Sequence, residues 1–451
     1  MKEIIKSNTA VSALIGNFKN KANQYREMYH LVKQKVEDGM LIYNSLTGAM
    51  FLLDKEETKM FESNSPSPDF LGELLKHYIF VPYNYNESLT SDQINSFMRM
   101  YISQRRDNII NKFTVFTTTD CNARCFYCFE NGRKYITMSE QTAMDVAKFM
   151  EKSAKGTDIS ISWFGGEPLY NEKVINIICQ YLFDKGLNYE STMVSNGYLF
   201  SAENIKTAKE KWHLKHVKIA VDGTEKIYNK YKNFIYKDGS AYLRVMNNIK
   251  MLLENNIAVT IRLNMDTHNY EDLFVLRDEL FERFGTNDLL TYDLHMLLEN
   301  STSVQKNRSD KERHEIVKKY HSLQSHYAEK FKTKKFKLSD VRRWTQCKAD
   351  DDRATTILPD GNLGKCEYYT TEGFWGNIYS SEVNYNEIQR FKEMMRPNGG
   401  EKCDKCPVRP ICMQLKVCAD TVDRCDEYDQ SQKIDLIKNV MLREYAEYKN
   451  K

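Results

Sequence analysis

The sequence has no apolar run of the roughly 18 or more residues that a membrane-spanning helix needs, and its mean hydropathy is -0.62. Its N-terminal segment also lacks an apolar stretch followed by a small-residue cleavage site, so it does not resemble a secretion signal. An excess of one charge is missing too, because 65 Lys and Arg against 62 Asp and Glu leave a net charge of +3. Charge alone therefore predicts neither nucleic acid nor a membrane as a partner. We expect a cytoplasmic protein.

What is present is the composition of a folded chain. Of the 451 residues, 41% are hydrophobic and 28% charged, which is ordinary for a soluble globular protein. At roughly 150 residues per domain, this length suggests about three domains.

The first part of the chain predicts a small domain. Residues 1–35 have a weak helical pattern, and two apolar runs at 40–44 and 49–54 flank a turn that contains Gly48, as in a β-hairpin. Three short helices are expected next, at 55–63, 68–78 and 91–107.

From Phe113 the pattern alternates between strands and helices. The predicted strands are 113–120, 158–167, 189–197, 216–223, 258–266 and 291–297. The predicted helices between them are 138–153, 172–183, 201–212, 241–256 and 269–284. Strands joined by helical crossovers indicate an α/β fold with a parallel sheet, and this repeated order favours a whole or partial (β/α) barrel. Further helices are expected at 308–333 and 434–450.

The cysteines are the most informative residues. Of the 11 cysteines, all but Cys179 fall in two groups, at 121–128 and 347–425. In a reducing compartment such groups indicate metal binding rather than disulfides, and thiolates select zinc, copper(I) or iron–sulfur clusters. Cys179 lies among apolar residues of a predicted helix, so we expect it to be a buried core residue.

The first group has the spacing C-x3-C-x2-C and follows the first strand of the predicted barrel. Three thiolates, from Cys121, Cys125 and Cys128, are able to hold three irons of a [4Fe–4S] cluster and to leave the fourth iron open. A structural zinc site is the alternative, but it requires four ligands, and no fourth Cys or His lies nearby in the sequence.

This motif, with an aromatic residue (Tyr127) before its last cysteine, resembles the radical S-adenosylmethionine (radical SAM) superfamily. The resemblance implies that the amino and carboxyl groups of S-adenosylmethionine bind the open iron. It also implies that reductive cleavage of this cofactor yields a 5'-deoxyadenosyl radical, which abstracts a hydrogen atom.

Further segments resemble motifs of the same family. Gly165-Gly166-Glu167-Pro168 is similar to its GGEP motif, in which backbone carbonyls and the carboxylate bind the methionine ammonium and the glycines allow close approach. Ser195-Asn196-Gly197 is similar to the segment that contacts the ribose, for which Thr192 is also a candidate.

Two more strand ends lie where related enzymes place cofactor contacts. These are Asp222, before Gly223, and Arg262. From the residues alone, Asp222 could instead cap a turn, and Arg262 could form an ordinary ion pair. The resemblance therefore implies one set of cofactor-binding residues: Tyr127, Gly165, Gly166, Glu167, Thr192, Ser195, Asn196, Asp222 and Arg262.

The second cysteine group resembles the SPASM extension of peptide-modifying radical SAM enzymes. The resemblance implies two auxiliary clusters, which brings the expected total to three [4Fe–4S] clusters. One would be held by Cys403, Cys406, Cys412 and Cys425. The other would be held by Cys347, Cys366 and Cys418, which leaves one iron open. The step from Cys412 to Cys418 departs from the family because it has five intervening residues where three are usual. The alternative is a pair of zinc knuckles.

The order of the N-terminal elements resembles the winged-helix peptide-recognition domain of enzymes that modify ribosomally made peptides. There, a leader peptide adds as an extra strand to the exposed edge of the hairpin sheet. The alternative is a structural cap.

Together, these resemblances predict a radical SAM/SPASM peptide maturase. The predicted domains are a leader-recognition domain (1–110), a partial (β/α)6 barrel (111–305), a helical linker (306–345) and a SPASM domain with a C-terminal helix (346–451). The expected partners are a precursor peptide with a leader and an electron donor such as flavodoxin or ferredoxin.

The most plausible reaction forms a cysteine thioether by hydrogen abstraction. Three alternatives stay open: carbon–carbon or carbon–oxygen cross-linking, a formylglycine-forming sulfatase-maturing dehydrogenase, and a zinc-binding interaction protein. Asp293 and His295 share one face of the sixth predicted strand and are possible barrel-facing residues.

Overall fold

The computed structural model describes residues 1–18, 24–104, 108–297, 309–331, 337–341, 347–392, 400–412, 425 and 427–450. The chain forms two compact units, one of Met1–Arg105, Lys335–Gln346 and Met394–Lys451, the other of Arg106–Lys334 and Cys347–Glu393. The predicted C-terminal domain of residues 346–451 is thus divided between the units. The predicted domain boundaries stay a prediction.

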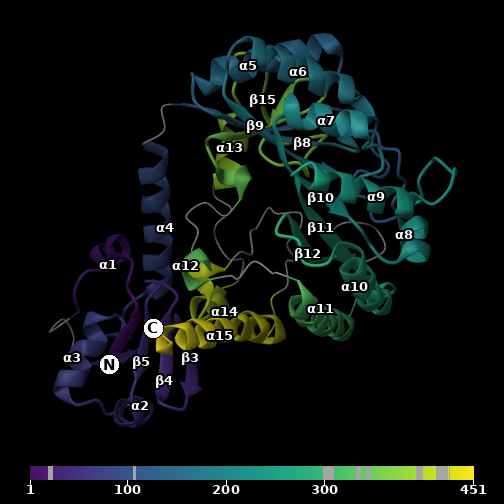
Figure 1. Ribbon diagram of the computed structural model, residues 1–451. Helices are drawn as coiled ribbons and strands as arrows, with labels where there is room; N and C mark the ends of the chain where they lie inside the picture. Colours follow the sequence, from purple (N-terminus) through teal and green to yellow (C-terminus); the bar gives the residue numbers. More distant parts are fainter. Residues whose placement is uncertain are drawn as a thin grey trace. The chain divides into compact units, whose positions relative to one another are not determined.

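The second unit is built on a nine-stranded sheet in which seven strands are parallel, and six of these lie side by side in sequence order (Figure 1). These strands are β7 (Lys112–Phe116), β8 (Ile159–Phe164), β9 (Tyr189–Ser195), β10 (Leu214–Ala220), β11 (Ala258–Met265) and β12 (Leu290–Met296). All six were expected from the alternating pattern, so the predicted α/β fold with a parallel sheet is confirmed.

Helices cover one face of this sheet (Figure 1). They are α5 (Glu140–Ala154), α6 (Glu172–Asp184), α7 (Ala202–Glu210), α9 (Ala241–Glu254) and α10 (Tyr270–Phe284). The serines before α5, α7 and α9 each accept a backbone N–H from the first turn, which is why these helices begin there. The sequence pattern missed α8 (Glu225–Lys232), while α11 (Asp310–Lys330) follows its predicted range.

The two faces of the sheet differ in chemistry. In β8, Ile159, Ile161 and Trp163 point into the helix-covered core, whereas Ser160 and Ser162 alternate with them on the other face. This second face, which we call the inner face, is polar in β9 to β12 as well. The strands of the sheet therefore carry a buried apolar side and a side suited to bind a polar ligand.

Three further strands extend the sheet beyond β7. They are β13 (Ala354–Ile357), which is parallel to β7, followed by the antiparallel β14 (Asn362–Gly364) and β15 (Phe374–Asn377). No regular pattern in the sequence predicts strands in this region, because short strands such as NLG and FWGN are specified by pairing with other segments. Three short helices complete the unit: η1 (Pro168–Asn171), η2 (Lys348–Asp350) and α13 (Tyr385–Lys392).

The first unit contains a four-stranded antiparallel sheet in the order β1-β5-β4-β3. Its strands are β1 (Lys2–Ile5), β3 (Leu31–Val36), β4 (Gly39–Asn44) and β5 (Met50–Leu53). The predicted hairpin corresponds to β4 and β5. The weak helical prediction for residues 1–35 is wrong. The described part of this segment contains two strands of the sheet, the short strand β2 (Tyr25–Glu27) and a single short helix, α1 (Thr9–Ile15).

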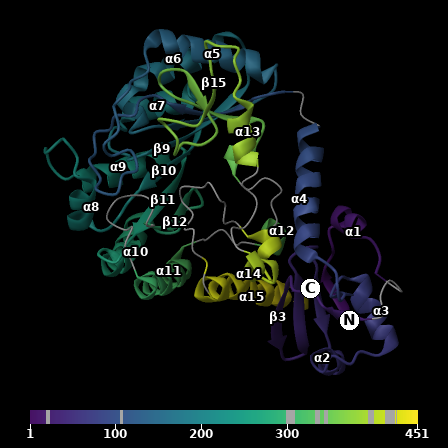
Figure 2. The same cartoon turned by 180° about the vertical axis from the view of Figure 1, so that it is seen from behind.

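Helices from both ends of the chain cover the two faces of this sheet. The remaining elements of the unit are α2 (Lys55–Glu62), α3 (Pro68–Lys76), β6 (Phe80–Pro82), α4 (Glu87–Gln104), α12 (Leu338–Val341), α14 (Gly400–Asp404), η4 (Arg409–Ile411) and α15 (Glu427–Lys449). One face packs on α2 and α3. On the other, Val32 and Tyr43 pack against Val440 and Met441 of α15, which lies beside β3 (Figure 2). The sheet core is thus completed by the C-terminal helix.

Within the described residues, none of the helices combines the length and the apolar character needed to cross a membrane.

Candidate cofactor and cluster site

The loop after β7 carries the first three cysteines, and N–H groups point at their sulfur atoms. The backbone N–H of Ala123 donates to Cys121 Sγ at 3.3 Å, and that of Glu130 donates to Cys128 Sγ. The side-chain amide of Asn196, at the end of β9, also donates to Cys121 Sγ at 3.6 Å. Because N–H donors stabilise a thiolate more than a thiol, this loop fits a ligand set for iron.

Burial holds these thiols in the protonated form when no metal is bound. Burial, followed by the nearby charge of Glu167, raises the pKa of Cys121 to about 12. Burial also raises the pKa of Cys128 to about 11 and raises that of Cys125. A metal has to displace these protons, so filling the site releases protons.

The two glycines after β8 allow this strand end to pack directly against the backbone of the cysteine loop. Gly165 has φ +133°, and a Cβ there would lie 2.1 Å from the carbonyl oxygen of Thr118. A Cβ on Gly166 would lie 2.2 Å from the carbonyl oxygen of Asp120. The N–H groups of Gly166 and Glu167 donate to these same two oxygens at 3.0 and 2.9 Å. At both positions, glycine is therefore required because another segment of the protein backbone passes close to it.

Glu167 is fully buried and ties the ends of β8 and β9 together. Its carboxylate accepts hydrogen bonds from Ser195 Oγ at 2.9 Å, from the N–H of Asn196 at 2.8 Å and from the N–H of Leu169 at 3.2 Å. Burial raises the pKa of Glu167 to about 7, although these donors favour the ionised form. The predicted site residues Glu167, Ser195 and Asn196 thus lie together, linked to one another.

Asp222 is also fully buried, at the centre of a second polar cluster beneath the cysteine loop. Its carboxylate accepts hydrogen bonds from the hydroxyl of Tyr127 and from Asn264 Nδ2 at 2.8 Å, and it pairs with Lys232 Nζ at 2.9 Å. The same ammonium donates to the Tyr127 hydroxyl at 2.6 Å. The carboxylate of Asp222 is therefore engaged by protein groups, and its predicted contact with a cofactor remains a prediction.

Thr192 and Arg262 lie on the inner face of the sheet. Thr192 pairs in register with Ser162 of β8, and Arg262 Nε donates to Asn264 Oδ1 at 3.2 Å. The structure thus brings all the predicted cofactor residues to one region, formed by the inner face and the carboxyl ends of β7 to β11.

Residues 115–280, which contain this region, match the profile of the Radical SAM superfamily. The chain carries a radical SAM domain. It is 23% identical over 282 residues, 58% of each chain, to the radical SAM cyclopropyl synthase TigE of Paramaledivibacter caminithermalis. It is 28% identical over 166 residues to the cysteine-type anaerobic sulfatase-maturating enzyme of Clostridium novyi, which covers 34% of this chain and 43% of that protein. The chain spans about half the length of these curated relatives.

Solved structures share the fold at low identity. Streptococcus suis SuiB bound to its precursor peptide SuiA has a TM-score of 0.52 and 12% identity, over 90% of this chain and 100% of that one. The structure of anSMEcpe with bound AdoMet has a TM-score of 0.56 and 16% identity, over 75% and 99%. These similarities establish a common fold.

Lys232 is a residue of the radical SAM domain that the sequence did not indicate. It ends α8, which follows Asp222, and no motif marks it. Its side chain is almost fully buried. Burial alone would lower the pKa of Lys232, but the negative charge of Asp222, and that of Cys125 when it is ionised, counteract this, so that the pKa of Lys232 is raised. The domain therefore holds a buried cation directly beside its cysteine loop.

We expect Lys232→Met to destabilise the radical SAM domain by about 3–5 kcal/mol, because it leaves the buried carboxylate of Asp222 without its cation. The double variant Lys232→Met/Asp222→Asn should recover part of this loss. Urea unfolding of the metal-free protein under reducing conditions measures both effects. Equal stability of the two variants would contradict the predicted coupling.

The first two cysteines of the second group approach each other in the same unit as the radical SAM domain. Cys366 Sγ accepts a hydrogen bond from the N–H of Tyr368 at 3.4 Å, and Cys347 accepts one from the N–H of Ala349. Burial, followed by the charge of Glu367, raises the pKa of Cys366 to about 12, and a charge on Cys347 contributes to this rise. Cys347 and Cys366 thus repeat the N–H to sulfur pattern of the first cysteine loop.

The loop of Cys366 also contacts the first cysteine loop. The ring of Phe129 stacks on that of Tyr368 with centroids 4.6 Å apart, and Arg133 donates to the carbonyl oxygen of Tyr368 at 3.2 Å. The loop of Cys366 and the first cysteine loop are therefore neighbours within this unit.

The remaining cysteines belong to the other unit. Cys412 is close enough to Cys425 for its charge to raise the pKa of Cys425, for which burial is the main cause. Cys403 and Cys406 lie one turn apart, since the N–H of Cys406 donates to the carbonyl of Cys403 at 3.1 Å. Cys418 lies outside the described residues. Among the described residues, no three Cys, His, Asp or Glu side chains converge as they would around a single ion. The cysteines of an iron–sulfur cluster each bind a different iron, so their side chains do not have to converge on a single point.

The structure also defines the surroundings of three further residues named above, Cys179, Asp293 and His295. Cys179 is 1% exposed within the core, as expected. Asp293 pairs with Lys218 on the inner face at 2.9 Å. Burial, followed by the charge of Arg262, lowers the pKa of His295 to about 4, so this side chain is neutral at physiological pH.

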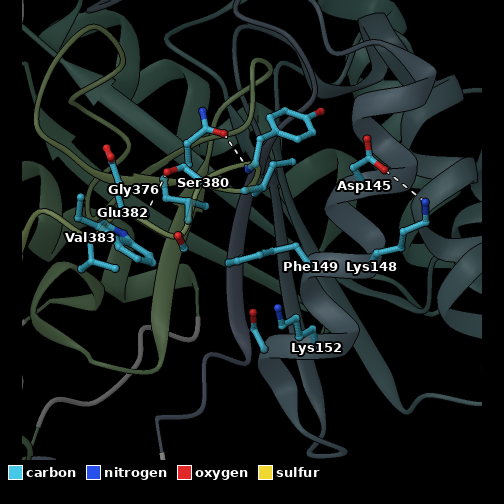
Figure 3. Close-up of a pocket in the computed structure, with 15 residues that line it drawn as sticks. Asp145, Lys148, Phe149, Lys152, Gly376, Ser380, Glu382 and Val383 are labelled. Carbon is cyan, nitrogen blue, oxygen red and sulfur yellow. Dashed lines mark hydrogen bonds and ion pairs between the residues drawn. The ribbon is translucent and has the colours of Figure 1, made fainter.

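A cavity of about 590 Å³ lies between α5 and β15, away from the cysteines (Figure 3). It borders Phe149, Ser153 and Tyr379. The N–H of Ile110, just before β7, donates to the carbonyl of Ser153 at 3.1 Å, so this cavity adjoins the amino end of β7, whereas the cysteine loop follows its carboxyl end.

Proposed function

We propose that this protein is a radical SAM peptide maturase that forms cysteine thioether cross-links in a ribosomally made precursor. The observation that carries the proposal is the cysteine loop after β7, in which N–H groups point at sulfur atoms beside the Glu167 and Asp222 clusters. Peptide-modifying enzymes among the relatives and the structural neighbours support the substrate class.

In this proposal, Cys121, Cys125 and Cys128 hold a [4Fe–4S] cluster, and S-adenosylmethionine binds next to it. Together these groups supply a 5'-deoxyadenosyl radical that abstracts a hydrogen atom. Glu167, Asn196 and Ser195 fix the strand ends that surround the cofactor. The buried ammonium of Lys232 offsets the negative charge of the thiolates.

We assign the two auxiliary clusters to the second cysteine group. Cys347 and Cys366, with Cys418, would hold one cluster. Cys403, Cys406, Cys412 and Cys425 would hold the other. The contact of Phe129 with Tyr368 supports the first assignment, because it places a second pair of thiols next to the first loop. An auxiliary cluster there is suited to accept the electron that remains when the cross-link closes.

The recognition of the leader needs a correction. The predicted binding element was the exposed edge of the hairpin at 40–54, but β4 and β5 are both interior strands. In the described chain, the free edges of this sheet are β3 and β1, and β3 is the longer. A groove of about 680 Å³ with Lys33, Lys35 and Phe61 among its lining residues runs along β3. We therefore assign leader binding to the edge of β3.

The hairpin turn identifies which backbone groups an added strand would use. Val36 pairs with Gly39 across a two-residue turn, and such a turn closes on a hydrogen-bonded pair. The N–H groups of Gln34 and Val36 thus face β4, whereas those of Lys33 and Lys35 face the free edge.

We expect Lys35→Pro to weaken binding of the precursor about tenfold or more, because it removes an outward N–H without breaking the β3–β4 ladder. Lys35→Ala is the matched control, since it removes the same charge but keeps the N–H. Fluorescence anisotropy of a labelled precursor measures both. Equal affinity of the proline and alanine variants would contradict strand addition at β3.

Point variants are preferable to removal of residues 1–105. Such a truncation would also expose the face of α15 that packs on β3 and β4.

The bond formed is tested on the product. A thioether requires a product that is lighter by two hydrogens per cross-link and a cysteine that resists alkylation. A precursor that is modified equally well after Cys→Ser replacement would instead favour a carbon–carbon or carbon–oxygen cross-link. The similarity to a cyclopropyl synthase makes carbon–carbon bond formation the closest alternative.

A further inference from the structure

Exposed aromatic side chains gather on the outer surface of the cysteine loop. Tyr135, Tyr170, Ile235 and Tyr236 are 50%, 41%, 41% and 39% exposed, respectively. With Arg124, they form what we call the tyrosine patch. Large apolar side chains clustered in water usually mark an interaction surface.

Contacts connect the patch from end to end. The guanidinium of Arg124 lies over the ring of Tyr135, 5.5 Å from its centroid, and pairs with Asp120 at 3.5 Å. Tyr170, which is close to both charges, is hydrogen-bonded to Tyr236. These side chains therefore form one continuous surface.

The patch is attached directly to the cysteine loop. Arg124 lies between Cys121 and Cys125, and its N–H donates to the carbonyl of Lys232 at 2.9 Å. The N–H of Ile235 donates to the carbonyl of Asn122 at 2.9 Å. A protein bound to this patch would thus be separated from the thiol groups by little more than the loop itself.

The charge around the patch is positive. The segments 131–135 and 235–239, which carry Tyr135 and Tyr236, are largely exposed. The charged residues of these segments and of the neighbouring loop are Arg124, Arg133, Lys134 and Lys237 against Asp120 and Asp238. Of these, Arg124 pairs with Asp120, and Arg133 donates to the carbonyl oxygen of Tyr368. Tyrosine and arginine are the residues most often found at the centre of protein interfaces, and a positive excess selects an acidic partner.

We propose that the tyrosine patch docks the electron donor, a small acidic one-electron carrier protein of the flavin or iron–sulfur type. This inference rests on the proposed function. The reduced carrier would give up one electron and be oxidised. With that electron, S-adenosylmethionine would be cleaved at the bond between its sulfur and its 5' carbon into methionine and the 5'-deoxyadenosyl radical. Electron transfer falls steeply with distance, so the carrier has to bind on a surface next to the cysteine loop. The polar groups assigned to the cofactor are not part of the tyrosine patch, since they lie on the inner face of the sheet and at the strand ends.

The experiment compares the carrier with a chemical reductant on the reconstituted full-length protein. The variants are Tyr236→Ser and Lys134→Glu/Tyr135→Ser, and purified bacterial flavodoxin and ferredoxin are the carriers. We expect the variants to bind the carriers about tenfold more weakly, and the wild-type affinity to fall as salt is raised. Cleavage of S-adenosylmethionine should slow to a similar extent with the carriers but stay within about twofold with dithionite.

Tyr379→Ser is the matched control. Tyr379 is 60% exposed in the same unit but borders the cavity at the amino end of β7. It should change neither binding nor either rate.

Three results would overturn the proposal: carriers that bind the variants as tightly as the wild type, carriers that do not bind the wild type, or variants that slow cleavage equally with dithionite. Wild-type protein that loads iron but cleaves no S-adenosylmethionine with dithionite would overturn the proposed function itself, and the docking proposal with it.

Discussion

Replacing Cys121, Cys125 and Cys128 together with alanine is expected to abolish cleavage of S-adenosylmethionine and to lower the iron content by one cluster in three. The reason is that these thiols are the only cysteines at the carboxyl ends of β7 to β11 in the described chain. The second cysteine group contributes none of these ligands, so its iron should remain. Iron and sulfide per protein and the yield of 5'-deoxyadenosine are the measurements.

Cys179→Ala is the control for this triple variant. Its thiol is buried in the core, so the change should cost about 1 kcal/mol of stability and leave iron content and cleavage unchanged. Anaerobically purified wild-type protein that contains stoichiometric zinc and little iron would overturn the cluster assignment and favour zinc sites.

Gly165→Ala is expected to destabilise the protein by about 3–5 kcal/mol, because two penalties combine at this residue. The backbone has φ +133°, and the added Cβ would lie 2.1 Å from the carbonyl oxygen of Thr118. Since that oxygen belongs to the backbone leading into the cysteine loop, relief of the clash would displace the loop. The iron content of the reconstituted variant should therefore fall as well.

Gly186→Ala separates the two penalties. Gly186 also has a positive φ, +65°, but a Cβ there would have nothing within 4 Å. It should cost only about 1 kcal/mol and leave the iron content intact. Urea unfolding of the metal-free proteins compares the two, and similar losses in both variants would show that the predicted clash is relieved elsewhere.

The sequence predicted the parallel sheet well, because β7 to β12 alternate with amphipathic helices and their patterns are local. It failed where pairing between strands overrides the preference of a single segment. Leu31–Val36 contains Leu, Lys and Gln, which favour helices, yet it forms β3 because β4 follows after a two-residue turn. The short strands β13 to β15 carry too few residues for any periodicity to appear.

The candidate site was also predicted only in part, because motifs are local whereas contacts between side chains are not. Motifs indicated Glu167, Asn196 and Asp222, and the structure brings them to one end of the sheet. Motifs did not reveal that these side chains bind one another or Lys232. The position of Lys232 beside Asp222 results from the packing of α8, and no local pattern in the sequence encodes it.

The sheet of the first unit has a consequence for the order in which the chain folds during synthesis. Val32 and Tyr43 are made early, but their buried partners Val440 and Met441 follow about 400 residues later. At about 5–20 residues per second, roughly 20 seconds or more separate the two. During that time, one apolar face of the sheet stays uncovered on the ribosome, which makes it a natural binding surface for a chaperone. This core closes only after α15 has been translated, so the assigned leader-binding edge gains its full packing late in synthesis.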